Sequence, residues 1–169
     1  FKCGGVVKRG DARAEMLGGR AWPLAAAALD ETLMTAHFRI VYTTRGVDSV
    51  DAAYGDRIAT YLEVAYERFS NGAEFQMRPP RSDDDPSDPA APIECQIIKI
   101  PGRIAGRARV GDDIPDDCER STSGTIFLHS RLDCPNQRLA SAHEVFHLFQ
   151  FREDPWASRW LLESTATWA

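Results

Sequence analysis

The chain has 169 residues, of which 43% are hydrophobic, 27% charged and 9% aromatic, and its formal net charge at pH 7 is −5. This composition and length are typical of one soluble globular domain that can bury a sizeable core without metals or disulfides, and they exclude collagen-like and largely disordered chains. No run approaches the roughly 18 to 20 apolar residues that a membrane helix needs, and an acidic chain is a poor nucleic-acid binder.

The first half of the chain predicts an irregular arm, a short helix, a strand and a long helix. Residues 1–20 are rich in glycine and charge, and residues 22–34 have an alanine-rich helical pattern. Residues 37–44 are β-branched and aromatic with alternating polarity, which predicts a strand. From 49 to 68 apolar residues recur at three- and four-residue intervals, the pattern of an amphipathic helix.

The second half predicts a loop, two strands and a buried helix. Residues 78–92 hold five prolines and an acidic string, and we expect a solvated surface loop there. Strands are predicted at 93–100 and 125–130, with a Gly- and Asp-rich connection over 102–117 between them. A second helical pattern covers 137–151. The fold class predicted is α+β: a mixed sheet, a long backing helix and a buried helix behind it.

The segment His143-Glu144-Val145-Phe146-His147 is an HExxH motif. Residues four apart project from one helix face about one turn apart, so two imidazoles can bind a single ion. Zinc accepts neutral imidazole nitrogen and prefers four ligands. Glu144 can then take a proton from a metal-bound water whose pKa the metal lowers to around 7. The motif predicts His143 and His147 as zinc ligands and Glu144 as the general base.

The flanks of the motif favour a buried helix. Between Arg138 and Phe151 the only charged residue is Glu144, and Leu139, Ala142, Phe146, Phe149 and Gln150 form a largely apolar stripe. Burying two histidines and a glutamate without partners would cost several kcal/mol, and a cation supplies a partner. The alternative is a pair of core histidines that hydrogen-bond to the main chain.

A third ligand must come from beyond the motif. Glu153 could serve only if the helix broke there. Glu163, 16 residues after His147, follows the turn that Pro155 imposes and lies in a second apolar helical segment. A carboxylate buried among apolar residues needs a positive partner, so we predict Glu163 as the third ligand. The alternative is an exposed glutamate on the polar side of an amphipathic helix.

HEVFH followed by WLLESTATW, residues 160–168, resembles the gluzincin branch of the zincin metallopeptidases. The likeness is closest to a family of secreted bacterial metalloproteases whose two helices have the patterns HE-x-x-H-x-x-Q and W-L-x-E-x-T-A-T-W. Residues 37–50 are similar to the start of that family's domain, whereas the middle third of the chain carries no matching motif. Ser164 stands where the family often has glycine, and the Asn-Glu-x-x-Ser-Asp pattern of the thermolysin-like group is missing.

The resemblance implies a single zincin-like catalytic domain over residues 1–169. Residues 1–151 would be the N-terminal lobe with the active-site helix, and 152–169 the start of an incomplete C-terminal lobe that begins with the Glu-ligand helix. It implies zinc as cofactor, His143, His147 and Glu163 as ligands, Glu144 as general base and a peptide or protein as substrate. A separate C-terminal segment or chain would supply the oxyanion-stabilising residue.

The cysteines and the first residue bear on the cell compartment. Four cysteines without a CxxC pair disfavour a four-thiolate zinc site and allow up to two disulfides, with Cys118 and Cys134 as the favoured local pair. Four reduced, buried thiols are the alternative. The chain opens on Phe1, so we expect that a segment was removed ahead of it. We therefore expect a secreted or extracellular protein, periplasmic or cell-surface locations included.

Two other functions are compatible with the sequence. The chain could be a non-catalytic secreted zincin-like binding module whose metal is structural or absent. A metal ion held by the same ligands could also catalyse the hydrolysis of a non-peptide bond. Of the other histidines, we expect His129, at the end of a strand, to be a surface or hydrogen-bonded residue, and His37 has no special role.

Overall fold

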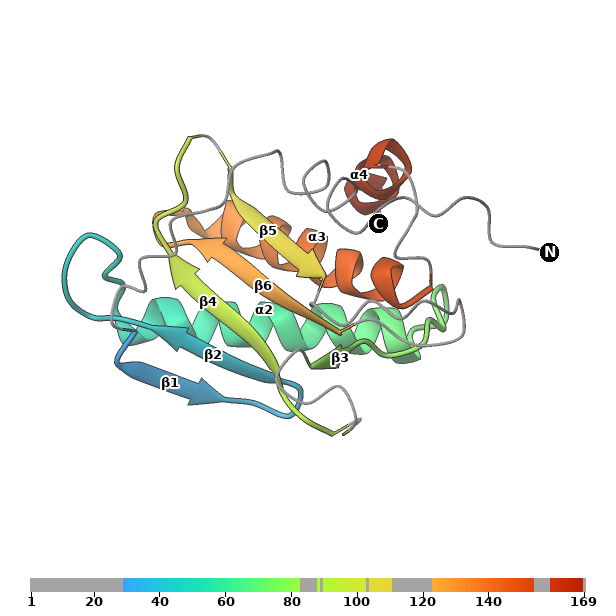
Figure 1. Ribbon diagram of the computed structural model, residues 1–169, viewed down its shortest axis with the longest axis horizontal. Coiled ribbons are helices and arrows are strands. Elements are labelled where there is room, and N and C mark those ends of the chain that lie inside the picture. The colour runs from blue at the N-terminus through green and yellow to red at the C-terminus, as the bar shows by residue number, and fades with distance from the viewer. Residues whose placement is uncertain are drawn as a thin grey trace, which may run out of the picture.

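One mixed sheet with helices packed against it makes up the described part of the chain, residues 29–82, 88, 90–102, 104–110, 123–153 and 159–168 of a computed structural model. The fold is α+β, as the sequence predicts. Helices α2 (Ala52–Asn71) and α3 (Cys134–Glu153) lie side by side behind the sheet, and α4 (Arg159–Trp168) lies against α3 (Figure 1).

The sheet has six described strands: β1 (Glu31–Met34), β2 (Phe38–Tyr42), β3 (Arg81–Ser82), β4 (Ile93–Ile98), β5 (Gly106–Val110) and β6 (Ser123–His129). Strands β2, β4 and β6 are parallel neighbours in that order. The short strand β3 is also parallel to β6, whereas β1 and β5 run antiparallel to β2 and β6. The two antiparallel strands thus lie at opposite edges.

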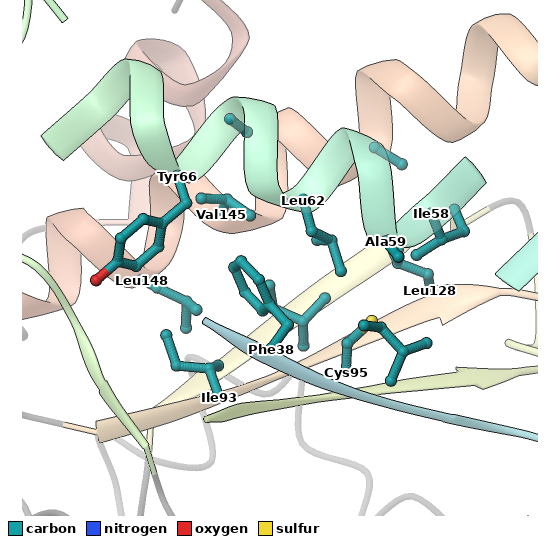
Figure 2. Close-up of a cluster of buried hydrophobic side chains, with 14 of the residues drawn as sticks. Phe38, Ile58, Ala59, Leu62, Tyr66, Ile93, Cys95, Leu128, Val145 and Leu148 are labelled. Carbon is teal, nitrogen blue, oxygen red and sulfur yellow. The ribbon is translucent and has the colours of Figure 1, made fainter. Parts of the chain in front are cut away.

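The core lies between the sheet and the two long helices (Figure 2). In β2 and β4 buried residues alternate with half-buried ones, so that one face of each strand points to the helices. Phe38, Ile40, Cys95 and Ile97 are fully buried on that face. The burial of these side chains fixes the strand register, because a slip of one residue would expose all of them.

Helix α2 confirms the long helix predicted over 49–68, with both ends shifted towards the C-terminus. It begins after Asp51, whose carboxylate accepts a hydrogen bond from the Tyr54 amide at 2.7 Å, and it ends at Asn71. Its buried residues recur at helical intervals: Tyr54, Gly55, Ile58, Ala59, Leu62, Ala65, Tyr66 and Phe69.

Helix α3 confirms the helix predicted over 137–151 and begins three residues earlier. Asp133 caps it, since its carboxylate accepts a hydrogen bond from the Asn136 amide at 3.0 Å. Pro135 lies in the first turn, where a missing amide hydrogen costs no helical hydrogen bond. The cap and the proline together set the start that the apolar pattern alone placed too late.

The helix predicted over 22–34 is wrong for residues 31–34, which form the edge strand β1; residues 22–28 lie outside the described part. The Thr35 hydroxyl accepts a hydrogen bond from the Phe38 amide at 3.0 Å, and this turn folds β1 back onto β2. Pairing with a buried neighbouring strand outweighs the weak helical propensity of this stretch.

The connection predicted over 102–117 is wrong for residues 106–110, which form the edge strand β5. Its register with β6 places Gly106 opposite Leu128 and Ala108 opposite Ile126. Small residues alternate with arginines here, so the apolar signal of a strand is weak, and pairing with β6 decides the structure. The loop predicted over 78–92 likewise contains the two-residue strand β3.

The described residues bear on two predictions, the lack of a membrane-spanning helix and the presence of disulfides. Within the described residues, no helix combines the length and the apolar character needed to cross a membrane. Cys95 is buried and Cys134 is exposed. No disulfide is seen within the described part of the chain; Cys118, the expected partner of Cys134, lies outside it, so that pairing stays a prediction.

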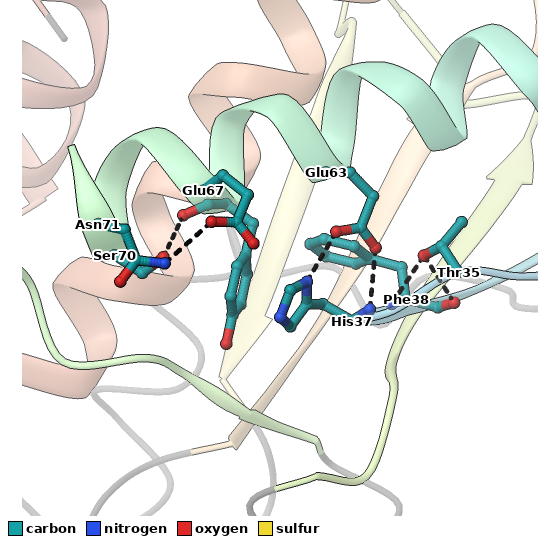
Figure 3. A network of polar contacts seen from close by, with 8 residues as sticks. Thr35, His37, Phe38, Glu63, Glu67, Ser70 and Asn71 are labelled. Carbon is teal, nitrogen blue, oxygen red and sulfur yellow. Dashed lines mark hydrogen bonds and ion pairs between the residues drawn. The ribbon is translucent and has the colours of Figure 1, made fainter.

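A polar network ties the β1–β2 turn to α2 (Figure 3). The Glu63 carboxylate accepts hydrogen bonds from the His37 amide at 2.8 Å and lies 2.7 Å from the His37 ring nitrogen Nδ1. The His37 ring stacks on Tyr66, with centroids 3.8 Å apart. Burial acts to raise the pKa of Glu63, but the hydrogen bonds from His37 and Thr35 outweigh it and lower the pKa overall.

We predict that Glu63→Gln lowers the free energy of unfolding by about 1 kcal/mol at neutral pH. A folded-state pKa below the unfolded value means that this stabilisation is present above the unfolded pKa and is lost as the pH falls through the folded one. Urea unfolding of both chains at neutral pH and below about pH 4 checks this. Glu67→Gln, an exposed control on the same helix, should show little change, and an equal loss for Glu63→Gln at both pH values would contradict the prediction.

Candidate metal centre

Helix α3 brings His143 and His147 together, as their spacing predicts. Their Nε2 atoms lie 3.0 Å apart, and the two rings are nearly perpendicular, at 89°. The side chain of His147 is 8% exposed and that of His143 is 21% exposed. Two ring nitrogens therefore face each other in a space that water only partly reaches.

Helix α4 brings Glu163 to the same point. One carboxylate oxygen, Oε2, lies 3.4 Å from Nε2 of His143 and 3.9 Å from Nε2 of His147. The Glu163 side chain is 52% exposed, so the expectation that this carboxylate is buried is wrong, although it does lie beside the two histidines. What holds Glu163 there is the packing of α4 on α3, in which Ala166 joins the core.

These three side chains match the donor set and the spacing of a four-coordinate zinc site. With ligands about 2.05 Å from the ion, the edge of a tetrahedral arrangement is roughly 3.3 Å. The three observed separations, 3.0, 3.4 and 3.9 Å, bracket that value. Among the described residues, this is the one cluster of three or more His, Cys, Asp or Glu side chains that could hold a metal ion.

The surroundings keep His147 in the neutral form that binds metals. Burial lowers the pKa of His147, and the neighbouring His143 lowers it further. Its other ring nitrogen, Nδ1, lies 2.7 Å from the Gln150 side-chain oxygen. A neutral imidazole with a hydrogen-bonded Nδ1 presents the lone pair of Nε2 to a metal.

The Glu144 side chain lies against the edge strand β5, close to Gly106. Ala105 and His129 form a hydrogen-bonded pair, because the His129 amide donates to the Ala105 carbonyl at 2.9 Å. Along an antiparallel pair of strands, residues that hydrogen-bond to the partner strand alternate with residues whose N–H and C=O groups point away from it. Because Ala105 bonds to β6, Gly106 and Ala108 are of the second kind, and their main-chain groups point away from β6. The Ala108 amide donates to the Glu144 carboxylate, which is how the edge of the sheet holds this side chain.

Burial raises the pKa of Glu144 to about 8. The Ala108 hydrogen bond opposes this shift, the negative charge of Glu163 adds to it, and Arg107 opposes it. A cation bound between the histidines would favour the carboxylate form again. The side chain is 5% exposed, so it is shielded from bulk water beside the candidate ligands.

A pocket of about 270 Å³ opens beside His143. It is lined by Ala105, Gly106, Asn136, Leu139, Ala140, His143, Glu144 and Thr167. Leu139 was expected on the buried stripe of α3, but it is 65% exposed and forms part of this wall. The pocket connects a predicted ligand and the predicted base with one open, largely apolar space.

Two other residues considered from the sequence lie elsewhere. Glu153 ends α3 and binds Arg78, with Oε2 and Nη2 2.9 Å apart. The Nδ1 atom of His129 accepts a hydrogen bond from the Arg131 amide at 3.0 Å, as expected of a hydrogen-bonded strand-end histidine. Neither residue belongs to the metal cluster.

Sequence reasoning missed the residues that support the site. The sequence predicts a connection at Gly106 and Ala108, and Gln150 enters only through the apolar stripe and the HE-x-x-H-x-x-Q pattern, without a role of its own. The one local signal was the glycine itself. A Cβ atom at Gly106 would lie 2.8 Å from Cγ of Glu144 and 2.9 Å from Cδ2 of Leu128, so only glycine lets Glu144 pass under the strand.

Comparison with protein-family models, curated proteins and solved structures finds no match for this chain. The likeness to gluzincins therefore rests on the residue patterns of the two helices and of the strand before α2. The geometry of the cluster on α3 and α4 is an independent observation.

We predict that Gly106→Ala lowers the free energy of unfolding by about 1 to 3 kcal/mol, because the new methyl group overlaps the Glu144 side chain. Truncating Glu144 removes part of that overlap, so the loss should be smaller when Gly106→Ala is made in a Glu144→Ala chain. Urea unfolding of the four chains measures both values. An identical loss in both backgrounds would place the clash elsewhere.

Proposed function

We propose that this chain is a zinc-dependent metallopeptidase of the gluzincin type. His143, His147 and Glu163 would hold the zinc ion, and Glu144 would be the general base. The observation that carries the proposal is the meeting of two imidazole nitrogens and a carboxylate oxygen at separations of 3.0 to 3.9 Å. Helices α3 and α4 supply them, beside a pocket that also borders Glu144.

The donor set favours zinc over magnesium or calcium. Two imidazoles with one carboxylate are the ligands of catalytic zinc sites, whereas the hard alkaline-earth ions prefer oxygen ligands only. Three protein ligands leave a fourth position for water or substrate. Within the described part of the chain the cluster has three such side chains, which supports a catalytic site over a closed structural one.

Bound zinc would polarise the scissile carbonyl and make an attacking water more acidic. Glu144 takes a proton from that water as its oxygen adds to the carbonyl carbon, and it passes the proton to the amine nitrogen when the C–N bond breaks. The Ala108 amide keeps the carboxylate aimed into the site before reaction. An extended peptide that adds to the outer edge of β5 would run past Glu144 and the pocket.

The remaining parts of the proposal follow from the motifs. The chain would have a zincin-like fold, with α3 as the active-site helix and α4 opening a C-terminal lobe. Its substrate would be a peptide or a protein. It would act outside the cytoplasm, where secreted members of the family that it resembles are found.

We predict that Glu144→Gln retains zinc binding and lowers the rate of peptide hydrolysis by about 10²- to 10⁴-fold, the usual contribution of a general base. The amide keeps the shape of the side chain and loses its ability to take a proton. Zinc content and cleavage of a peptide library measure the two effects. Glu153→Gln, the same substitution at the end of the same helix, is the control, and undiminished turnover in Glu144→Gln would remove the assigned role.

We predict that Glu163→Ala lowers zinc affinity by at least about 100-fold, more than is typical for a residue that only orients a ligand. Competition with a chelator measures the affinity of wild type and variant. Ser164→Ala, at the exposed neighbouring position on α4, should leave it unchanged. Equal affinities for Glu163→Ala and wild type would show that the carboxylate is not a ligand.

A further inference from the structure

The Gln150 side chain lies between a predicted zinc ligand and the helix that carries another. Its oxygen, Oε1, is 2.7 Å from Nδ1 of His147, three residues earlier on α3. Its nitrogen, Nε2, donates a hydrogen bond to the Thr165 hydroxyl on α4. Thr165 stands two residues after Glu163. His147 is buried and Thr165 is half-buried, so bulk water competes with these hydrogen bonds only in part.

The first of these contacts selects one form of the His147 ring. A neutral imidazole carries its proton on one nitrogen and offers a lone pair on the other. The Gln150 oxygen can only accept, so it favours the proton on Nδ1 and leaves Nε2 as the lone-pair nitrogen. Nε2 is the atom that faces Nε2 of His143 and Oε2 of Glu163.

In the second contact the amide nitrogen of Gln150 faces Thr165 and its oxygen faces His147. The nitrogen of Gln150 finds an acceptor in the Thr165 hydroxyl, so the oxygen remains for His147. Turning the amide around would direct an NH₂ group at Nδ1 and move the ring proton to Nε2, where it would occupy the metal-facing position. Loss of the Thr165 hydroxyl would remove this acceptor from the Gln150 nitrogen, and the Gln150 oxygen sets the tautomer of His147.

We propose that Gln150 and Thr165 form a positioning pair that holds His147 in its metal-binding tautomer and docks the Glu163 helix onto the histidine helix. The inference rests on the proposed zinc site. Neither residue touches substrate or metal, and both act through the ligands. The hydrogen bonds run without a break from His147 on α3 to α4, so loss of either member should disturb both.

The tautomer of His147 can be read without any metal, by ¹⁵N NMR of the ring at a pH above the imidazole pKa. In wild type we expect the proton on Nδ1. Gln150→Leu, which removes the acceptor, should shift His147 towards the Nε2-protonated form. Gln150→Glu keeps an acceptor for Nδ1–H, and the Thr165 hydroxyl can donate to its other oxygen, so this variant should retain the wild-type tautomer.

Zinc affinity, measured by chelator competition, tests the consequence. Gln150→Leu should weaken binding by about 10- to 100-fold and Gln150→Glu by much less. Thr165→Val should also weaken it. The double variant Gln150→Leu, Thr165→Val should lose little more than Gln150→Leu alone, because both members belong to one chain of hydrogen bonds. Thr60→Val, on the exposed side of α2, is the control and should bind as wild type does.

The tautomer and the zinc affinity together distinguish failure of the proposed function from failure of the proposed role of Gln150 and Thr165. If wild type does not bind zinc, the proposed function fails and so does the metal role of the pair. If wild type binds zinc but Gln150→Leu keeps both the Nδ1 proton and the affinity, the role of Gln150 is wrong and the peptidase proposal stands. Additive losses in the double variant would contradict the connection through Thr165.

Discussion

Two imidazole nitrogens held 3.0 Å apart on one buried helix are the constraint around which the site is arranged. Removed from most of the water, two lone pairs at this distance need a proton or a cation between them. The helix cannot rotate to expose them, because Val145, Leu148 and Phe149 on its other faces are at most 1% exposed in the core. Any compensating charge must therefore come to α3 from other elements or from solution.

Elements distant in sequence contribute to the site around α3 in different ways. The sheet and α2 bury the back of α3 and fix its position. The edge strand β5 supplies the Ala108 amide that holds Glu144, and Gly106 leaves the room for it. Helix α4 supplies Glu163, whose half-exposed carboxylate leaves one side of the cluster open to solvent. Shielding on one side and access on the other are what a hydrolytic site needs.

Local patterns predicted the elements whose own residues determine their structure. The apolar periodicity predicted over 49–68 survives in the structure because most of its members, among them Tyr54, Ile58 and Leu62, are buried on the face that packs on the sheet and α3, whereas Ala53 is exposed. The two histidines of α3 meet because their spacing is a property of the helix itself. Where periodicity was weak, prediction failed: residues 31–34 and 106–110 are strands only because β2 and β6 offer them partners. Edge strands with small or charged residues carry little signal of their own.

The sequence by itself determined the α+β class, the long helices and the pairing of His143 with His147, because each depends on contacts within a few residues. It also indicated Glu163, although for a wrong reason, since that carboxylate is half-exposed. Only the tertiary structure decided that β5 holds Glu144, that Leu139 lines a pocket, and that Gln150 links His147 to Thr165. Some of these contacts join segments far apart in the chain, and the others depend on the rotation of α3 and α4 about their axes. A short stretch of sequence shows neither the distant partner nor the rotation of a helix.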